Sequence, residues 1–307
     1  FDENNHITSY NYVGTIASIN MGTIQGCVNN ADITATNFAA GGICGFMVNG
    51  CGTIKDCENY GDIKAMSYAS GICGGSQSGK SITTYNYLIE DCLNSGKLST
   101  TNGVGSAGIA GSYSGAIKNC NNNGNVDDTQ GTSKSKLYTA GIVSCASFAV
   151  DIEGCYNRGA ISGVKNVGGI VGNVMKGDEA ATVIKNCRND GSVSGQDMYV
   201  AGIAANSARN EGVVSVVSCT NNGEVTSTGT TEFIGNLRGN TTIALGEGNI
   251  IGAGLKALPL DPDTQTGIDN TNVNTGNTTN GVFLRNGQIV IVKNNKKYTI
   301  SGIEIAE

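Results

Sequence analysis

Acidic residues are the first candidates for chemistry, because Asp56 and Asp91 each stand directly before a cysteine that recurs along the chain. Paired carboxylates hydrolyse glycosidic bonds, and lyase chemistry on uronates needs a base together with cations. The other copies of this position carry neutral residues, namely Gly26, Asn119, Gly154, Asn186 and Ser218. An acidic row only two residues long, with no basic cluster beside it, predicts no catalytic site. A polysaccharide-degrading lyase or glycosidase stays as the alternative.

Two further acidic pairs, Asp127-Asp128 and Asp178-Glu179, fall between the recurring segments. They are expected in loops, where solvated acids or a weak Ca²⁺ site are commoner than catalysis. No metal ligand is therefore predicted from them.

Cysteine is the second residue type that could do chemistry. The chain has eleven cysteines, no Cys-x-x-Cys pair and a single histidine, His6, so neither a zinc site nor a cofactor is expected. Seven cysteines recur once per repeat and are predicted to face the core as small hydrophobic residues. Cys44 and Cys73 align with each other in a second phrase. Cys51 and Cys145 lie outside both rows and are expected to be the most exposed thiols.

Tyrosines supply a third candidate. Tyr68, Tyr138 and Tyr199 each stand four residues before an isoleucine of the repeat. A repeating fold would bring them onto one face, and exposed tyrosines there would suit a sugar or peptide ligand. The alternative is that their rings cover the core, and the absence of tryptophan counts against strong sugar stacking.

All these residues are positioned by one sequence motif, Ile-x-x-Cys-x-Asn-x-Gly-x-Ile, which occurs seven times with minor variation and which we call the repeat phrase. Its cysteines are 28 to 35 residues apart. A period near 32 residues with variable insertions indicates stacked repeats, none of which buries its apolar face alone. The copies span residues 24–33, 54–63, 89–98, 117–126, 152–161, 184–193 and 216–225.

The apolar runs of each repeat are too short for helices and fit short strands. Cysteine, asparagine, glycine and isoleucine stand at even offsets, so they point to one side of an extended chain. We predict an all-β, right-handed parallel β-helix of about seven to eight coils, since parallel crossovers nearly always take that hand. Stacking then creates two structural ladders, one of Cys27, Cys57, Cys92, Cys120, Cys155, Cys187 and Cys219, and one of Asn29, Asn59, Asn94, Asn122, Asn157, Asn189 and Asn221.

A second phrase follows in each repeat, for example Gly-Ile-Cys-Gly at 42–45, Gly-Ile-Ala-Gly at 108–111 and Gly-Ile-Val-Gly at 169–172. Paired with Cys-x-Asn-x-Gly, it resembles the GLUG-repeat family, and the resemblance covers about residues 13–240. That family occurs in bacterial cell-surface and secreted proteins. The resemblance implies a β-solenoid and an extracellular or cell-surface location, and it implies no catalytic residues.

The remaining segments set the predicted domain limits. Residues 1–12 form a lead-in or cap, 13–241 the repeats, 242–280 a linker that holds both prolines, and 281–307 a short C-terminal β-strand module. Its strands are predicted over 281–284, 288–293 and 297–303, and it is similar to the C-terminal ends of exported Bacteroidetes proteins. Insertions at 76–87 and 127–136 are expected to protrude as loops, where function tends to lie.

Charge limits the partners. A net charge of −6 and only 19 Lys plus Arg argue against nucleic acid. No apolar run approaches the roughly 18 residues that cross a bilayer, and an export signal is expected outside the given residues. The sequence favours a non-enzymatic, surface-displayed or secreted solenoid that serves as an adhesin-like binding module or spacer. Expected partners are host or polysaccharide glycans or a surface protein. An accessory module of a larger surface assembly is a further alternative.

Overall fold

The computed structural model describes residues 6–78, 85–102, 104–130, 137–175, 182–197, 199–207, 211–228, 231–237, 240–245, 247–252, 255, 280–285, 288–293, 296–299 and 304–305. The chain divides into two units, Phe1–Lys256 and Ala257–Glu307. All the secondary-structure elements among these residues are β-strands. No helix in this described part is long and apolar enough to cross a membrane.

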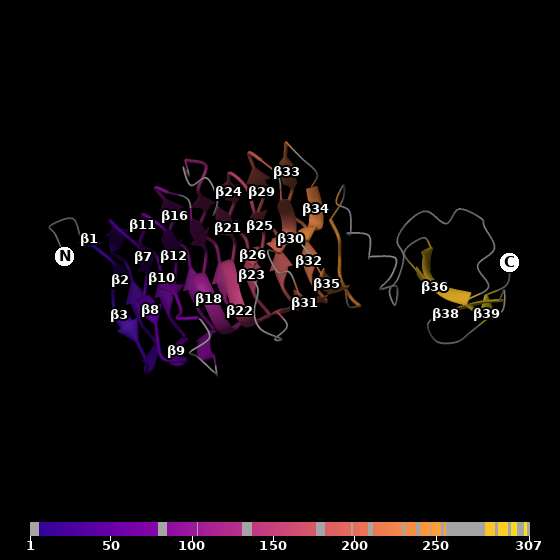
Figure 1. The fold of residues 1–307 in the computed structure, drawn as a ribbon, viewed down its shortest axis with the longest axis horizontal. Coiled ribbons are helices and arrows are strands. Elements are labelled where there is room, and N and C mark those ends of the chain that lie inside the picture. Colours follow the sequence, from indigo (N-terminus) through magenta and orange to yellow (C-terminus); the bar gives the residue numbers. More distant parts are fainter. Residues whose placement is uncertain are drawn as a thin grey trace. The chain divides into compact units, whose positions relative to one another are not determined.

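The first unit is a parallel β-solenoid, as predicted. Its strands pair in parallel with the equivalent strands of the preceding and following repeats, so that successive coils lie side by side in Figure 1. The hand of the coil stays a prediction. Among the described residues, eight strands stack in one sheet and seven in another, while a third sheet joins the longer runs.

The eight-stranded sheet holds the isoleucine that ends each repeat phrase. Its strands in stacking order are β1 (His6–Ser9), β6 (Asp32–Ala35), β11 (Ile63–Ala65), β16 (Leu98–Thr100), β20 (Val126–Asp127), β24 (Ile161–Gly163), β29 (Val193–Gly195) and β33 (Val225–Ser227).

The seven-stranded sheet holds the asparagine of each phrase. Its strands in stacking order are β5 (Val28–Asn29), β10 (Glu58–Asn59), β15 (Leu93–Asn94), β19 (Asn121–Asn122), β23 (Tyr156–Asn157), β28 (Arg188–Asn189) and β32 (Thr220–Asn221).

The third sheet has twenty strands and holds both the Gly-Ile phrase and the isoleucine that opens each repeat. Its strands are β2 (Tyr12–Gly14), β3 (Ala17–Asn20), β4 (Thr23–Gln25), β7 (Ala39–Gly41), β8 (Cys44–Met47), β9 (Cys51–Lys55), β12 (Tyr68–Ser70), β13 (Cys73–Gly75), β14 (Asn86–Glu90), β17 (Gly105–Ala107), β18 (Ala110–Lys118), β21 (Tyr138–Ala140), β22 (Val143–Glu153), β25 (Val167–Gly168), β26 (Val171–Val174), β27 (Thr182–Lys185), β30 (Val200–Ser207), β31 (Glu211–Val217), β34 (Thr231–Leu237) and β35 (Asn240–Leu245).

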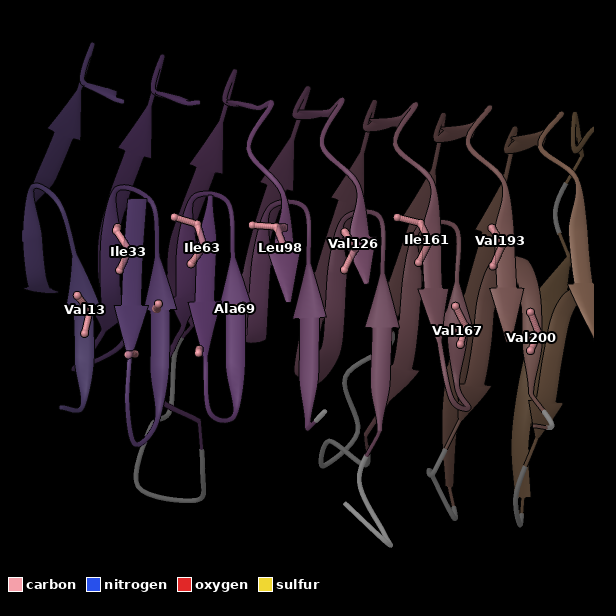
Figure 2. Close-up of a cluster of buried hydrophobic side chains, with 13 residues drawn as sticks. Val13, Ile33, Ile63, Ala69, Leu98, Val126, Ile161, Val167, Val193 and Val200 are labelled. Carbon is pink, nitrogen blue, oxygen red and sulfur yellow. The ribbon is translucent and has the colours of Figure 1, made fainter. Parts of the chain in front are cut away.

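Aliphatic side chains of equivalent positions stack into rows inside the coils. Figure 2 shows one such row, in which Ile33, Ile63, Leu98, Val126, Ile161 and Val193 follow one another from coil to coil. Each of these side chains is at most 1% exposed. Burial of a side chain of this size contributes about 1.5–3 kcal/mol relative to exposure, so each row stabilises the stack of coils.

The asparagines form a continuous hydrogen-bonded ladder through the same interior. From Asn29 to Asn189, each Nδ2 donates to the Oδ1 of the asparagine in the following coil, for example Asn94 to Asn122 at 2.8 Å and Asn122 to Asn157 at 2.8 Å. The same Nδ2 donates to the carbonyl two residues further on, as Asn122 does to Gly124 at 2.9 Å. Both amide protons are therefore satisfied inside the protein, as a buried amide requires.

Two glycine positions make this packing possible. A Cβ on Gly124 would overlap the carbonyl oxygen of Gly96 in the preceding coil, and a Cβ on Gly108 would overlap the side chain of Asn122. The glycine of the Gly-Ile phrase thus lies against the asparagine ladder across the interior. The two recurring phrases are therefore partners in one packing arrangement.

The solenoid differs from the sequence-based expectation at its predicted loops. Within 76–87, Tyr87 belongs to β14, is only 1% exposed, and its hydroxyl accepts a hydrogen bond from the Gly50 N–H at 2.7 Å. Within 127–136, Asp127 belongs to β20. Residues 79–84 of the first insertion and 131–136 of the second lie outside the described part of the chain.

The second unit contains a four-stranded antiparallel sheet of β36 (Asn280–Arg285), β37 (Gln288–Lys293), β38 (Lys296–Thr299) and β39 (Glu304–Ile305). The first two strands match the predicted segments closely. The predicted strand over 297–303 is represented by β38, and residues 300–303 lie outside the described part.

Candidate binding face

Two rows of side chains project from the outer side of the seven-stranded sheet, which we call the ladder face. The inward asparagine leaves the residues one and three places after each ladder cysteine facing outward, which follows from the two-residue period of a strand. The first outer row is Val28, Glu58, Leu93, Asn121, Tyr156, Arg188 and Thr220, and the second is Asn30, Tyr60, Ser95, Asn123, Arg158, Asp190 and Asn222.

Four neighbouring side chains on two strands of the ladder face form a square. Tyr156 and Arg158 come from the strand region of β23, and Arg188 and Asp190 come from that of β28. The Arg158 Cζ lies 3.6 Å from the centre of the Tyr156 ring, and the Arg188 Cζ lies 5.1 Å from it. These are distances at which guanidinium groups are attracted to an aromatic face.

Asp190 is fully engaged within this square. It accepts hydrogen bonds from Arg188 Nε at 2.8 Å and Nη2 at 2.7 Å, and also from the Tyr156 hydroxyl. Asn222 Nδ2 donates to it at 2.9 Å. The bond from Arg188 is the largest cause that lowers the pKa of Asp190 to about 2, so this carboxylate is ionised at neutral pH and offsets the charge of Arg188.

Arg158 differs from Arg188 in its partners. Its guanidinium is exposed and makes one side-chain hydrogen bond among the described residues, from Nη1 to Asn123 Oδ1 at 3.3 Å. Because arginine has five N–H donors, most of its donating capacity points to solvent. The Tyr156 ring holds this cation in place without neutralising it.

Amide side chains project from the coil next to Arg158, and one of them, Asn123, is hydrogen-bonded to its guanidinium. Asn119, Asn121, Asn123 and Asn125 alternate along the neighbouring coil, and all four are exposed or half-buried. Asn125 Oδ1 accepts a hydrogen bond from the Ala160 N–H at 3.0 Å, which ties the two coils together. The surface therefore combines one free positive charge with several groups that can both donate and accept hydrogen bonds.

The tyrosines predicted as ligand contacts lie on the twenty-stranded sheet instead. Tyr68 is opposite Gly105, and Gly105 is opposite Tyr138, so these two tyrosines share a row on alternate coils. Tyr138 is 9% exposed. Tyr68 is half-buried, its ring makes an edge contact with Phe38 at 5.6 Å, and burial raises the pKa of its hydroxyl.

Tyr199 continues that row, since its carbonyl accepts from the Val167 N–H at 3.0 Å and the next residue pairs with Val167. Its side chain is half-buried and its φ is 69°. The structure thus brings the three tyrosines into one row, and places much of Tyr68 and nearly all of Tyr138 beneath neighbouring atoms.

The acidic row before the ladder cysteine has a conformational role. All seven residues of the row have positive φ, between 51° and 65°. Glycine, asparagine and aspartate tolerate this left-handed turn best, which explains why they dominate the position. Asp56 accepts from Gln25 Nε2 at 2.9 Å, while Asp91 accepts from Asn119 Nδ2 at 3.3 Å and lies 3.6 Å from Lys55 Nζ.

The Asp127-Asp128 pair contradicts the expectation of two solvated loop acids. Asp127 is exposed, but Asp128 is 1% exposed. Its Oδ1 accepts from the backbone and hydroxyl of Thr100 and from the Ser106 hydroxyl, each at 2.8 Å. Its Oδ2 accepts from the Ser106 N–H at 3.0 Å and the Thr139 hydroxyl at 3.2 Å. Burial raises the pKa of this carboxyl.

The other predicted acidic pair, Asp178-Glu179, lies outside the described residues. In the part of the chain that the structure describes, no group of three or more His, Cys, Asp or Glu side chains could hold a metal ion.

The cysteines are all free thiols, and nine of the eleven are buried. The ladder thiols lie near backbone carbonyls, as Cys120 Sγ does at 3.2 Å from the Lys118 oxygen. Burial raises the pKa of Cys120, Cys155 and Cys187, which keeps them as unreactive thiols. Cys145 was expected to be exposed and is only 1% exposed, because it faces inward from β22, whereas Cys51 is half-buried.

Comparison with known proteins gave no match to a protein-family model, to a curated protein or to a solved structure.

Proposed function

We propose that this chain is a surface-displayed or secreted β-solenoid that acts as an adhesin-like binding module, with the ladder face as its binding surface. The observation that carries the proposal is the exposed Arg158 guanidinium, held on the Tyr156 ring among amide side chains. Arg158 is held in position and makes no ion pair with another described residue, and such an exposed charge is better suited to a ligand than to stability, because exposed charges add little to folding.

The geometry of the acids supports binding over cleavage. Asp56 and Asp91 sit in tight turns and are hydrogen-bonded to Gln25 and Asn119. Asp128 is buried and saturated by five hydrogen bonds. None of these three carboxylates has the free, facing arrangement that general acid–base chemistry on a sugar requires.

A glycan array with mucin, other host and plant structures tests the proposal. Specific binding that is lost in Arg158→Gln and kept in Lys97→Gln is the expected result. Lys97 is exposed on the third coil, so its replacement makes the same change in net charge away from the square. Absence of binding to any glycan would favour a spacer or a protein-interaction module instead.

A further inference from the structure

We propose that the Arg158–Tyr156 pair binds the carboxylate of an acidic sugar residue, such as a uronic acid unit within a polysaccharide. This inference rests on the proposed function and names the ligand class of the same face.

The first argument is the fixed orientation of the guanidinium. Arg158 stacks on the Tyr156 ring at 3.6 Å, and its Nη1 is anchored on Asn123. Tyr156 is itself held, because its hydroxyl donates to Asp190. A planar guanidinium whose plane is already set presents its free N–H edge as a fork that matches a carboxylate, and little side-chain entropy is lost on binding.

The second argument is charge. The square contains two guanidinium groups and one carboxylate, and the carboxylate is bonded to Arg188 through both of its oxygens. One positive charge is left over, and it belongs to Arg158. One uncompensated guanidinium in the square matches one carboxylate, and the net charge of −6 on the chain disfavours a densely charged polyanion.

The third argument is that another arginine of the same face already binds a carboxylate. Arg188 holds Asp190 by two hydrogen bonds of 2.8 Å and 2.7 Å, which is the bidentate arrangement that arginine makes with carboxylates. Arg158 lies in the neighbouring coil with the same group, and among the described residues no carboxylate is hydrogen-bonded to it. A ligand carboxylate would take the place that Asp190 takes for Arg188.

The fourth argument identifies a sugar as the carrier of the carboxylate. Asn121 and Asn123 stand beside the pair and offer amide donors and acceptors to hydroxyl groups. The Tyr156 ring already carries guanidinium groups, so stacking of an apolar ligand on it is blocked. The surface around Arg158 therefore favours a polar ligand with many hydroxyls over an apolar one.

Isothermal titration of the full chain with trigalacturonic acid tests the inference, with galactotriose as the neutral probe and a heparin tetrasaccharide as the sulfated one. We expect trigalacturonic acid to bind and galactotriose to bind at least tenfold more weakly. Arg158→Gln should lower the affinity for trigalacturonic acid at least tenfold, and Lys97→Gln should change it less than twofold. Asp190→Asn should raise it, because Arg188 then gains a free charge beside the site. Thermal unfolding of each variant checks that the solenoid is intact.

Three results would overturn the inference. If galactotriose binds as tightly as trigalacturonic acid, the face binds glycans without recognising a carboxylate. This result would refute the inference and leave the proposed function intact. Tighter binding of the heparin tetrasaccharide would assign the site to sulfate. No binding of any of the three probes, together with an empty glycan array, would remove both the inference and the proposed function.

Discussion

The two ends of the solenoid present the same repeat phrase in different surroundings. In the first coil, Ile16 takes the position that Ile43 takes in the next, yet Ile16 is 46% exposed and Ile43 is fully buried. At the other end, Cys219 is fully buried although it belongs to the last repeat phrase.

The segment at 247–252 explains the difference. Asn249 Oδ1 accepts from the Cys219 N–H at 2.8 Å, and its Nδ2 donates to the Val216 carbonyl at 3.0 Å. The backbone of Ile250 exchanges hydrogen bonds with Cys219 and Asn221. The residues of a coil are therefore buried by the neighbouring coil or segment that packs against them. A single copy of the repeat phrase does not bury its own apolar residues.

Glycine usage follows the same rule. Five of the interior glycines at one position, from Gly96 to Gly223, have a glycine carbonyl of the preceding coil directly beneath them, and Gly61 has that of Ala31. The first phrase carries Ala31 at this position. The chain thus keeps a side chain only where no earlier repeat phrase stacks against it.

The largest effect should come from Gly124→Ala, which places a Cβ against the Gly96 carbonyl in the middle of the stack. We expect the free energy of unfolding to fall by about 3–5 kcal/mol, since neither backbone can move without its neighbours. The matched change at the end, Ala31→Gly, should cost less than about 1 kcal/mol. Urea unfolding of both variants measures the contrast, and equal losses would contradict the stacking argument.

The asparagine ladder gives the next contrast. Asn122→Ala leaves the Asn94 Nδ2 and the Asn157 Oδ1 each without its ladder partner, so we expect a loss of about 2–4 kcal/mol. Asn29→Ala breaks a single ladder bond, to Asn59, and should cost about half as much. Thermal unfolding of the pair would sharpen the comparison, and an Asn122→Ala variant as stable as the parent would refute it.

Asp128 tests how much the buried hydrogen bonds around one carboxyl contribute to the stability of an interior coil. In Asp128→Asn, one oxygen becomes an NH₂ group that faces the Thr100 or Ser106 N–H, so we expect a loss of about 1–3 kcal/mol.

The same variant has a pH dependence of defined sign. The pKa of Asp128 is raised in the folded state, so its contribution to stability is fully present below the unfolded value of about 3.9 and is lost as pH rises through the folded value. The stability difference between parent and Asp128→Asn should therefore shrink as pH rises from 3.5 to 7. A difference that grew with pH would show that burial does not control this carboxyl.

The smallest effect is expected for Cys120→Ser, at about 1–2 kcal/mol. The serine hydroxyl is smaller and more polar than the thiol, but the Lys118 carbonyl at 3.2 Å from Sγ can accept its proton. Cys27→Ser, in the half-exposed first coil, should change stability less. Calorimetric melting curves for both variants decide between an inward ladder and a solvent-facing one.

The fold could be predicted because the repeat phrase states each constraint seven times. Cys, Asn, Gly and Ile at even offsets must share one side, and Cys57, Asn59, Gly61 and Ile63 are all buried. The same alternation could have placed Asp128 inside, two residues after the inward Val126, and Cys145 inside, two residues after Val143. At both positions the two-residue period of the strand determines burial, and neither the charge of Asp128 nor the place of Cys145 outside the ladders overrides it.

The square on the ladder face could not be predicted in the same way. Tyr156, Arg158, Arg188 and Asp190 each occur once at their positions, so no repetition marks them. Alignment of the repeats would have placed them on adjacent strands. Which arginine pairs with Asp190 and which stacks on Tyr156 depends on side-chain rotamers, and spacing carries no information about those.

The asparagine ladder also determines how the solenoid responds to tension. Its hydrogen bonds join one coil to the next, so they run along the stack, whereas the backbone runs across it. A pull along the stack loads these junctions in series, and the weakest one opens first. We expect the first coil to open first, because its Ile16 is 46% exposed where the equivalent Ile43 of the next coil is fully buried. Each coil of about 32 residues that comes free lengthens the chain by about 100 Å, so the solenoid would yield to force in steps while its remaining coils stay folded.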